Sequence, residues 1–333
     1  MYNYGSLHFK YTYFIVVFLF YACVPEKKIN DDLLWYNQPA KNWNEALPLG
    51  NGKLGVMVFG NTTTERIQLN DDSMWPADSG DWTEPEGNKK DLKEIRELLF
   101  DGKNEEADKL FVDKFSRKKI VRSHQTLGDL FIAFDHQNIS DYRRELNISN
   151  ATATVTYKSN GSLITEKIFV SHPDKAVLIE ISSEAAEGLN AKLRLSRPKD
   201  KGFETAKVFT TDEKLLVMEG EVSQRDGVFN SAPYPILNGV KFETSLKVNN
   251  KGGIIERGAD YLELKNVKKA TIYLVSNSSY YYYYDSYQQQ NKIDMQALTS
   301  KSFAVLKKEH IKDYQNLYGL PSKFVTIFVK PIF

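Results

Sequence analysis

The stretch that decides the fold lies near the start of the chain and is rich in tryptophan and glycine. It reads Leu34-Trp35-Tyr36, then Trp43-Asn44-Glu45-Ala46-Leu47-Pro48-Leu49-Gly50-Asn51-Gly52-Lys53-Leu54-Gly55, then Ile67-Gln68-Leu69-Asn70-Asp71-Asp72-Ser73-Met74-Trp75. The closely spaced glycines indicate a tight turn, because glycine adopts positive φ and lets other backbone approach closely. Alternating apolar and polar residues over 56–59 and 66–69 predict two short strands after that turn.

From His124 onward the alternation continues in many short segments. Asn160-Gly161, set between two alternating runs, is a strong signal for a β-hairpin. Strand candidates are residues 131–134, 151–157, 163–170, 176–181, 191–195, 207–210, 214–219, 240–248, 254–256, 261–264 and 270–276. Short strands at a spacing of roughly 8–12 residues, separated by turn signals, are typical of a sandwich or barrel rather than of an α/β fold.

Two regions have helical spacing instead. Leu92, Ile95 and Leu99 share one face of a predicted helix, and a second helix is predicted from Asn104. Residues 294–318 return to the same spacing near the end of the chain. The sequence therefore predicts an all-β fold, a large antiparallel β-sandwich of the supersandwich type, with a small helical insertion and a C-terminal linker helix.

Bulk composition excludes several classes of function. The 333 residues carry 44 Lys and Arg against 43 Asp and Glu, a formal charge of +1, so a nucleic-acid surface or a polybasic membrane patch is not expected. Aromatic residues make up 13% of the chain, which suits the stacking of sugar rings but also fits a biased genome. The single cysteine, Cys23, excludes a disulfide framework within the chain.

The first residues have the pattern of an export signal. An apolar run from Tyr11 to Tyr21 follows Lys10 and is too short to span a bilayer, which needs roughly 20 apolar residues. Ala22 before Cys23 resembles a bacterial lipoprotein cleavage box, so Cys23 is the expected site of lipid attachment. A plain signal peptide or short anchor with an incidental cysteine is the alternative.

The tryptophan-rich stretch resembles the N-terminal domain of glycoside hydrolase family 95, the α-L-fucosidase-like enzymes. The family pattern is close to Trp-Asn-Glu-Ala-Leu-Pro-(Ile/Leu)-Gly-Asn-Gly-x-Leu-Gly followed by Gln-Leu-Asn-Glu-Asp-x-x-Trp. Residues 310–318 are similar to the helix that links this domain to the next one in the family. The resemblance implies an all-β domain, a helical linker, an (α/α)6 barrel and a small β domain, and inverting hydrolysis of α-L-fucosides or related α-L-galactosides.

The resemblance places all catalytic residues of the family in the barrel, and none has a matching position in this sequence. The expected organisation is a lipoprotein-type signal at 1–23, a tether at 24–32, the β-sandwich at 33–290, a helical linker at 291–318 and an aberrant tail at 319–333, without the barrel. We therefore expect no catalytic residue. Asp71 and Asp72 are adjacent and point to opposite faces of an extended segment, whereas Glu45 and Asp72 could converge only in three dimensions.

Four residues are candidates for a sugar-binding surface: Trp43, Asn70, Asp72 and Trp75. Indole rings stack on pyranose faces, and Asn and Asp make paired hydrogen bonds to vicinal hydroxyls. The alternative for the tryptophans, Trp35 included, is packing in the core or at a domain interface, and for Asn70 and Asp72 it is turn capping. Tyr280 to Tyr284 form either a stacking surface or a tolerated loop repeat.

Two hypotheses of function remain open, with a third behind them. The chain is either the non-catalytic N-terminal domain of an exported α-L-fucosidase-like hydrolase, here a fragment without activity, or a free-standing carbohydrate-binding module at the cell envelope. A structural adhesin is the weaker third. Whether the chain counts as an enzyme stays open. The expected partners are a fucosylated glycan, a membrane reached through the lipid anchor and, in an intact enzyme, the catalytic barrel. Neither a cofactor nor a metal is expected, because the five histidines lack metal-like spacing.

Overall fold

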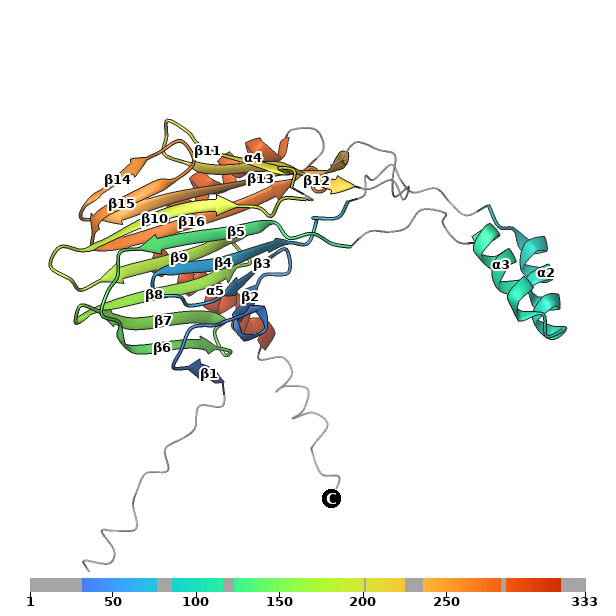
Figure 1. The fold of residues 1–333 in the computed structure, drawn as a ribbon, viewed down its shortest axis with the longest axis horizontal. Coiled ribbons are helices and arrows are strands. Elements are labelled where there is room, and N and C mark those ends of the chain that lie inside the picture. Colours follow the sequence, from blue (N-terminus) through green and yellow to red (C-terminus); the bar gives the residue numbers. More distant parts are fainter. Residues whose placement is uncertain are drawn as a thin grey trace, which may run out of the picture.

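A computed structural model describes residues 32–76, 86–115, 123–200, 202–224, 236–282 and 286–318. Several features of the sequence lie outside these ranges, namely the expected signal with Cys23, most of the tether, Trp82 and the tail from 319. The described part consists of two large antiparallel sheets and a few helices, drawn in Figure 1. This architecture confirms the predicted all-β sandwich with small helical parts.

Strand order joins segments that are far apart in the sequence. The nine-stranded sheet has the order β1-β6-β7-β8-β9-β16-β13-β12-β11, and the seven-stranded sheet has the order β14-β15-β10-β5-β4-β3-β2. The strands are β1 Leu33–Tyr36, β2 Leu47–Gly50, β3 Leu54–Val58, β4 Thr64–Asp71, β5 Gly128–Phe134, β6 Ser140–Asn147, β7 Thr152–Ser159, β8 Ser162–Ser171, β9 Ala176–Ser183, β10 Leu189–Ser196, β11 Ala206–Thr210, β12 Leu216–Gln224, β13 Ile236–Lys251, β14 Ile254–Arg257, β15 Leu262–Val267 and β16 Lys269–Ser278.

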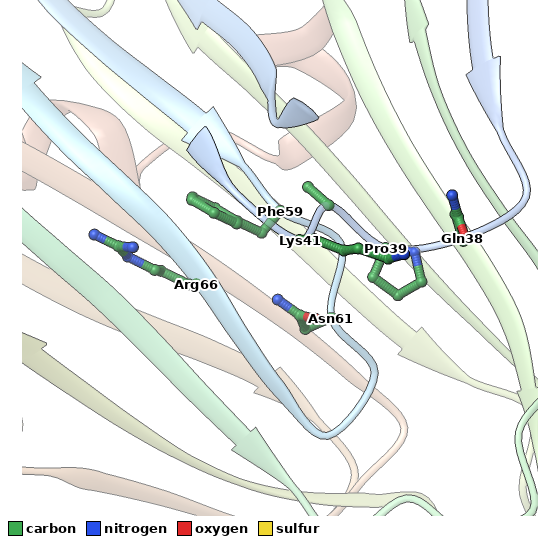
Figure 2. Close-up of a pocket in the computed structure, with 7 residues that line it drawn as sticks. Gln38, Pro39, Lys41, Phe59, Asn61 and Arg66 are labelled. Carbon is green, nitrogen blue, oxygen red and sulfur yellow. The ribbon is translucent and has the colours of Figure 1, made fainter. Parts of the chain in front are cut away.

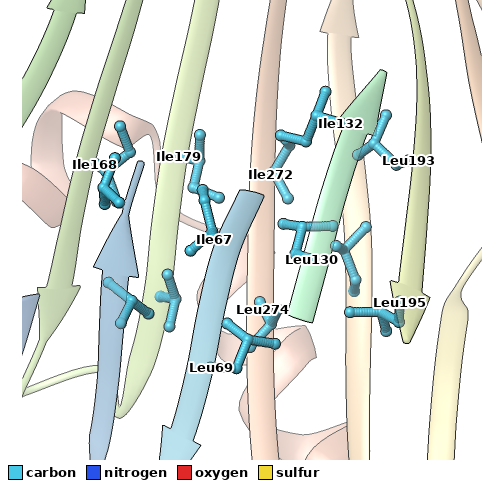
Figure 3. Close-up of a cluster of buried hydrophobic side chains, with 14 of the residues drawn as sticks. Ile67, Leu69, Leu130, Ile132, Ile168, Ile179, Leu193, Leu195, Ile272 and Leu274 are labelled. Carbon is cyan, nitrogen blue, oxygen red and sulfur yellow. The ribbon is translucent and has the colours of Figure 1, made fainter. Parts of the chain in front are cut away.

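The main core lies between the two sheets. Because side chains alternate along a strand, every second residue of β4 points inward, and Ile67 and Leu69 are fully buried there. Figure 3 shows Ile67 beside Ile179 and Leu69 beside Leu274, two residues of the facing sheet. Strand β2 escaped sequence prediction because it contains Pro48, which a sheet tolerates at its edge, where β2 lies.

A second hydrophobic cluster covers the outer face of the nine-stranded sheet. Helices α4 (Ser286–Thr299) and α5 (Phe303–Tyr318) lie against this face, where Met295, Leu298 and Leu306 pack on Phe169 and Tyr273. None of the helices that the structure describes is long and apolar enough to cross a bilayer. The seven-stranded sheet has no helix on its outer face in the described part of the chain (Figure 1).

The predicted helical insertion is present as α2 (Lys89–Phe100) and α3 (Asn104–Phe115). Asn88 caps α2 by accepting from the backbone N–H of Asp91, whose carboxylate accepts the Asn88 N–H in return. The two helices pair with each other and lie apart from the sandwich (Figure 1). The insertion therefore adds little to the main core.

One region between the sheets is polar. Glu65 on β4 and Glu166 on β8 occupy inward positions and are fully buried. The backbone N–H groups of Gly60 and Asn61 donate to the Glu65 carboxylate. One Glu166 oxygen accepts from the Tyr157 hydroxyl at 3.4 Å, whereas the other has no hydrogen-bond partner among the described residues. Burial raises the pKa of Glu65 to about 8 and raises that of Glu166 well above its ordinary value.

Candidate functional site

The end of β4 forms a tight corner that carries two of the predicted site residues. Asp71 is buried, and its carboxylate accepts from the backbone N–H and the hydroxyl of Ser73 at 3.0 and 2.6 Å. The Ser73 hydroxyl also lies 2.7 Å from that of Ser278 on β16. These bonds turn the chain sharply, so that Asp72 and Trp75 project outward. The turn-capping role proposed for Asp72 thus belongs to its neighbour Asp71.

Asp72 meets a tyrosine from the far end of the sequence. The Tyr281 hydroxyl donates to Asp72 Oδ2 at 2.8 Å, and both side chains are exposed. Partial burial and then this hydrogen bond raise the pKa of Tyr281, so the phenol stays protonated and acts as a donor. Tyr280 packs edge-on against Tyr281, with ring centroids 5.0 Å apart. Tyr281 thus connects the start of the tyrosine repeat to the corner.

Lys53 ties this corner to the facing sheet. Its Nζ donates to the Ser276 carbonyl at 2.9 Å and to Asn277 Oδ1 at 2.6 Å, and it lies 5.3 Å from the centroid of the Tyr281 ring. Burial lowers the pKa of Lys53, while nearby Asp71 opposes that shift. The preceding Gly-Asn-Gly turn is set by Asn51, whose side chain accepts from the backbone N–H groups of Lys53 and Leu54.

A polar network continues behind Lys53. The Asn277 amide donates to Asn291 Oδ1 and to Asp294 Oδ2, each at 2.9 Å, and Asn291 donates in turn to the carbonyl of Glu243. Sequence reasoning missed these residues, because asparagines and aspartates on separate elements give no local motif. Only the glycine turn before Lys53 pointed toward this region.

Trp75 lies on the other side of the corner. Its ring contacts His124 edge-on at 5.2 Å, and His124 Nε2 lies 2.8 Å from the carbonyl oxygen of Asp71. The Trp75 side chain is 43% exposed. Trp75, Asp72 and Tyr281 together form what we call the corner site, an open aromatic and hydrogen-bonding surface.

The other two predicted residues lie elsewhere. Trp43 belongs to the short 3-10 helix Trp43–Glu45, capped by Asn42, and is 56% exposed. Asn70 is exposed on the outer face of the seven-stranded sheet, opposite Gly55 on β3. Among the described residues, no hydrogen bond or ring contact joins either residue to the corner site. Glu45 accepts from its own loop, from the Lys41 N–H and the Asn42 amide.

The tryptophans are not core residues. Trp35 on β1 is 55% exposed, and the Arg143 guanidinium lies 4.8 Å from its ring centroid. With Trp43 and Trp75 also about half exposed, the expectation that these rings pack in the core is wrong. Packing at an interface with another domain remains a prediction. Arg143 also forms an ion pair with Glu145 at 2.8 Å.

The corner site exposes three kinds of functional group to solvent. It offers a carboxylate, a phenol and an indole at an open surface, a set that suits hydrogen bonding and stacking on a sugar ring. The described residues contain no group of three or more His, Cys, Asp or Glu placed to hold a metal ion. The hollow shown in Figure 2 contains none of the four predicted residues.

Comparisons with known proteins agree with these features at the level of the domain. The profile of the family described as "Glycosyl hydrolase family 65, N-terminal domain" matches residues 34–283. "Alpha-L-fucosidase 2" of Arabidopsis thaliana is 26% identical over 311 residues, which cover 86% of this chain and 36% of that protein.

Two fungal proteins are also similar. "Probable alpha-fucosidase A" of Aspergillus niger is 25% identical over 308 residues, covering 86% of this chain and 37% of its own length. Its namesake in Aspergillus oryzae is 30% identical over 162 residues, 46% of this chain and 22% of that protein. A solved structure provisionally named as a kojibiose phosphorylase from the human microbiome matches with a TM-score of 0.49 at 14% identity, covering 86% of this chain and 38% of that one. The chain spans between 22% and 37% of the length of these curated relatives.

Proposed function

The chain belongs to the family described as glycosyl hydrolase family 65, N-terminal domain, and we propose that it is the non-catalytic N-terminal domain of an exported, family 95-like α-L-fucosidase. The reaction of the whole enzyme would be inverting hydrolysis of terminal α-L-fucosides. The names of the three relatives support the fucosidase activity. Catalytic residues would come from a barrel domain, for which the greater length of these relatives leaves room.

The observation that carries the proposal is the exposure of the tryptophan-rich stretch. Burying an indole stabilises a domain substantially, yet Trp35, Trp43 and Trp75 are each about half exposed. Half-exposed tryptophans held in fixed positions are typical of surfaces that meet a ligand or another domain. We infer that the corner site faces the sugar or the rim of its pocket, whereas Trp43 and Trp35 contact the neighbouring domain.

The first experiment is an activity assay on the purified chain with an aryl α-L-fucoside. We expect no turnover, because the corner site lacks a second carboxyl group across an open pocket, which inverting hydrolysis requires. Turnover that disappears in Glu45→Gln or Asp72→Asn would overturn the assignment as a non-catalytic domain.

The second experiment asks whether the corner site binds fucose-containing sugars. Fucosyllactose added to the chain should perturb the NMR signals of Asp72 and Tyr281, with weak, millimolar affinity, and Trp75→Ala should abolish the change. Trp35→Ala is the matched control, because it removes an indole of similar exposure on β1. Equal loss in both variants, or in neither, would contradict a sugar-facing role for the corner site.

A free-standing carbohydrate-binding module is the second candidate, favoured by the same open surface. Such a module must bind its sugar without the help of another domain. A micromolar dissociation constant of the chain alone for a fucosylated oligosaccharide would therefore favour the module. Millimolar or weaker binding favours the enzyme domain.

We also propose export to the bacterial cell envelope through a lipid on Cys23. Metabolic labelling with a palmitate analogue should mark the wild-type chain but not Cys23→Ser. Labelling that survives this substitution would refute the anchor.

A further inference from the structure

The outer face of the seven-stranded sheet carries a row of side chains that no step above uses. Arg66 on β4 lies directly opposite Phe131 on β5, and Phe131 lies directly opposite Arg194 on β10. All three occupy outward positions, next to inward residues that are buried. Since neighbouring strands are about 4.8 Å apart, the Cα atoms of the two arginines stand about 10 Å apart, with that of Phe131 between them.

Among the described residues, each arginine has an ion-pair partner but also N–H groups without a hydrogen-bond acceptor. Arg66 Nε donates to Asp129 Oδ1 at 2.7 Å, and its guanidinium lies 5.0 Å from the centroid of the Phe59 ring. Among the described residues, its two Nη groups make no hydrogen bond. Their N–H groups point along the planar fork that binds carboxylate or sulfate with two parallel bonds.

Arg194 repeats this arrangement on the other side of Phe131. Its Nη1 donates to Asp260 Oδ2 at 3.3 Å, and its guanidinium lies 5.1 Å from the centroid of the Tyr261 ring. The Nε and Nη2 groups have no partner within the described part of the chain. Lys192 Nζ lies 4.4 Å from the same ring, which adds positive charge beside Arg194.

The row lies between two shallow hollows. One, of about 560 Å³, is bounded by Arg66, Phe59, Asn61 and Lys41 (Figure 2). The other, of about 450 Å³, is lined by Phe131 and Arg194, together with Leu195, Ser196, Arg197, Glu204, Ala206, Val208 and Asp260. The row and its hollows thus form an elongated surface with a donor group on each side of an aromatic ring.

We propose that the Arg66–Phe131–Arg194 row binds an acidic oligosaccharide, one that carries carboxylate or sulfate groups on sugars two positions apart. The Phe131 ring contacts the apolar face of the middle sugar, and each guanidinium pairs with one acidic group. The separation of the two arginine Cα atoms, about 10 Å, is about that of two linked pyranose rings. This site is separate from the corner site and does not rest on the proposed fucosidase activity.

The charges of the face favour this ligand over two others. Asp129, Asp260 and Glu263 each pair with a basic residue of this face, and the chain has a formal charge of only +1, so the face lacks the surplus of positive charge that the closely spaced phosphates of a nucleic acid require. A neutral sugar could accept from the remaining N–H groups of Arg66 and Arg194, but those hydrogen bonds would lack the anionic partner that makes a charge-assisted pair stronger. An oligosaccharide with spaced acids avoids both problems.

The test is a titration of the whole chain with an oligogalacturonate and with a maltooligosaccharide of equal length, in low salt. We expect binding of the acidic sugar only, weakened by added salt. Arg66→Gln and Arg194→Gln should each weaken it about tenfold, the loss expected for a charge-assisted hydrogen bond. Phe131→Ala should weaken it as well.

Arg257→Gln provides a matched control, because Arg257 forms an ion pair with Asp212 at the edge of the same sheet, away from the row. Thermal unfolding of each variant separates a binding defect from a folding defect. Equal binding of the neutral sugar, equal binding of sodium sulfate alone, or unchanged binding by both arginine variants would each overturn the proposal.

Discussion

The buried pair Glu65 and Glu166 makes the stability of this domain depend on pH in an unusual direction. The other ionisable groups that face the pair are Tyr142, Tyr157 and Arg144. Arg144 forms no ion pair with either acid, since it donates instead to the backbone carbonyls of the loop before β2. Burial therefore dominates, and the folded domain keeps protons on the pair that the unfolded chain would release.

The size of the effect follows from Glu65. Its pKa rises from an ordinary 4.5 to about 8. At about 1.36 kcal/mol per pH unit, this rise changes the free energy of unfolding by at most about 5 kcal/mol between low and high pH. Because the folded pKa is the higher one, this stability is fully present below about pH 4.5. It is lost as the pH rises toward about 8, and the raised pKa of Glu166 acts in the same direction.

Glu65→Gln tests this reasoning by keeping the side chain neutral at every pH. The amide cannot accept from both the Gly60 and Asn61 N–H groups, so we expect a loss of about 1–3 kcal/mol that does not depend on pH. The variant should therefore be less stable than wild type near pH 4.5 and more stable near pH 8. Urea unfolding at several pH values would locate the crossing point.

Two further variants complete this experiment. Glu166→Gln should also make the free energy of unfolding depend less on pH, and it removes no backbone hydrogen bond. It replaces Glu65→Gln in the experiment if that variant fails to fold. Glu106→Gln, at an exposed position on α3, should leave the profile unchanged. Parallel wild-type, Glu65→Gln and Glu166→Gln profiles between pH 4.5 and 8 would refute the account of the buried pair.

Four other substitutions test the fold. Arg144→Met should lower the free energy of unfolding, measured with urea, by about 2–4 kcal/mol, because two loop carbonyls lose a charged hydrogen-bond donor. A decrease of less than about 0.5 kcal/mol would contradict this expectation. Trp43→Ala should lower the free energy of unfolding by less than about 1 kcal/mol, because Trp43 is exposed. Phe169→Ala should lower it by about 3–5 kcal/mol, because Phe169 is fully buried under α5. Equal losses in the two variants would show that Trp43 belongs to the core. Gly128→Ala should lower the midpoint of thermal unfolding by several degrees, because a Cβ would lie 2.4 Å from the Ser196 carbonyl oxygen and φ is +145°; an unchanged midpoint would argue against this backbone geometry.

Much of the candidate site could be located from sequence, but its composition could not. The sequence analysis named Asp72 and Trp75 as candidates, but it gave the glycines before Lys53 only as a tight turn. Tyr281 was ambiguous, because a tyrosine repeat has the same local pattern whether it is ordered or not. Its hydrogen bond to Asp72 joins residues more than 200 positions apart, and no local pattern reports such a contact.

Local alternation determined which elements are strands and which of their residues point inward. Ile67 and Leu69 are buried because a strand has two faces and only one can meet the core. Turn chemistry determined the hairpin at Asn160-Gly161 by the same kind of short-range rule, since both residues adopt positive φ.

The tertiary structure alone decided which strands are neighbours and what lies opposite each inward residue. Strand β16 lies between β9 and β13, and Glu65 meets Glu166 from the facing sheet. The same pairing placed Arg66, Phe131 and Arg194 in one row. The physical reason is that periodicity specifies a direction for each side chain, whereas partners are chosen by the joint burial of the whole chain.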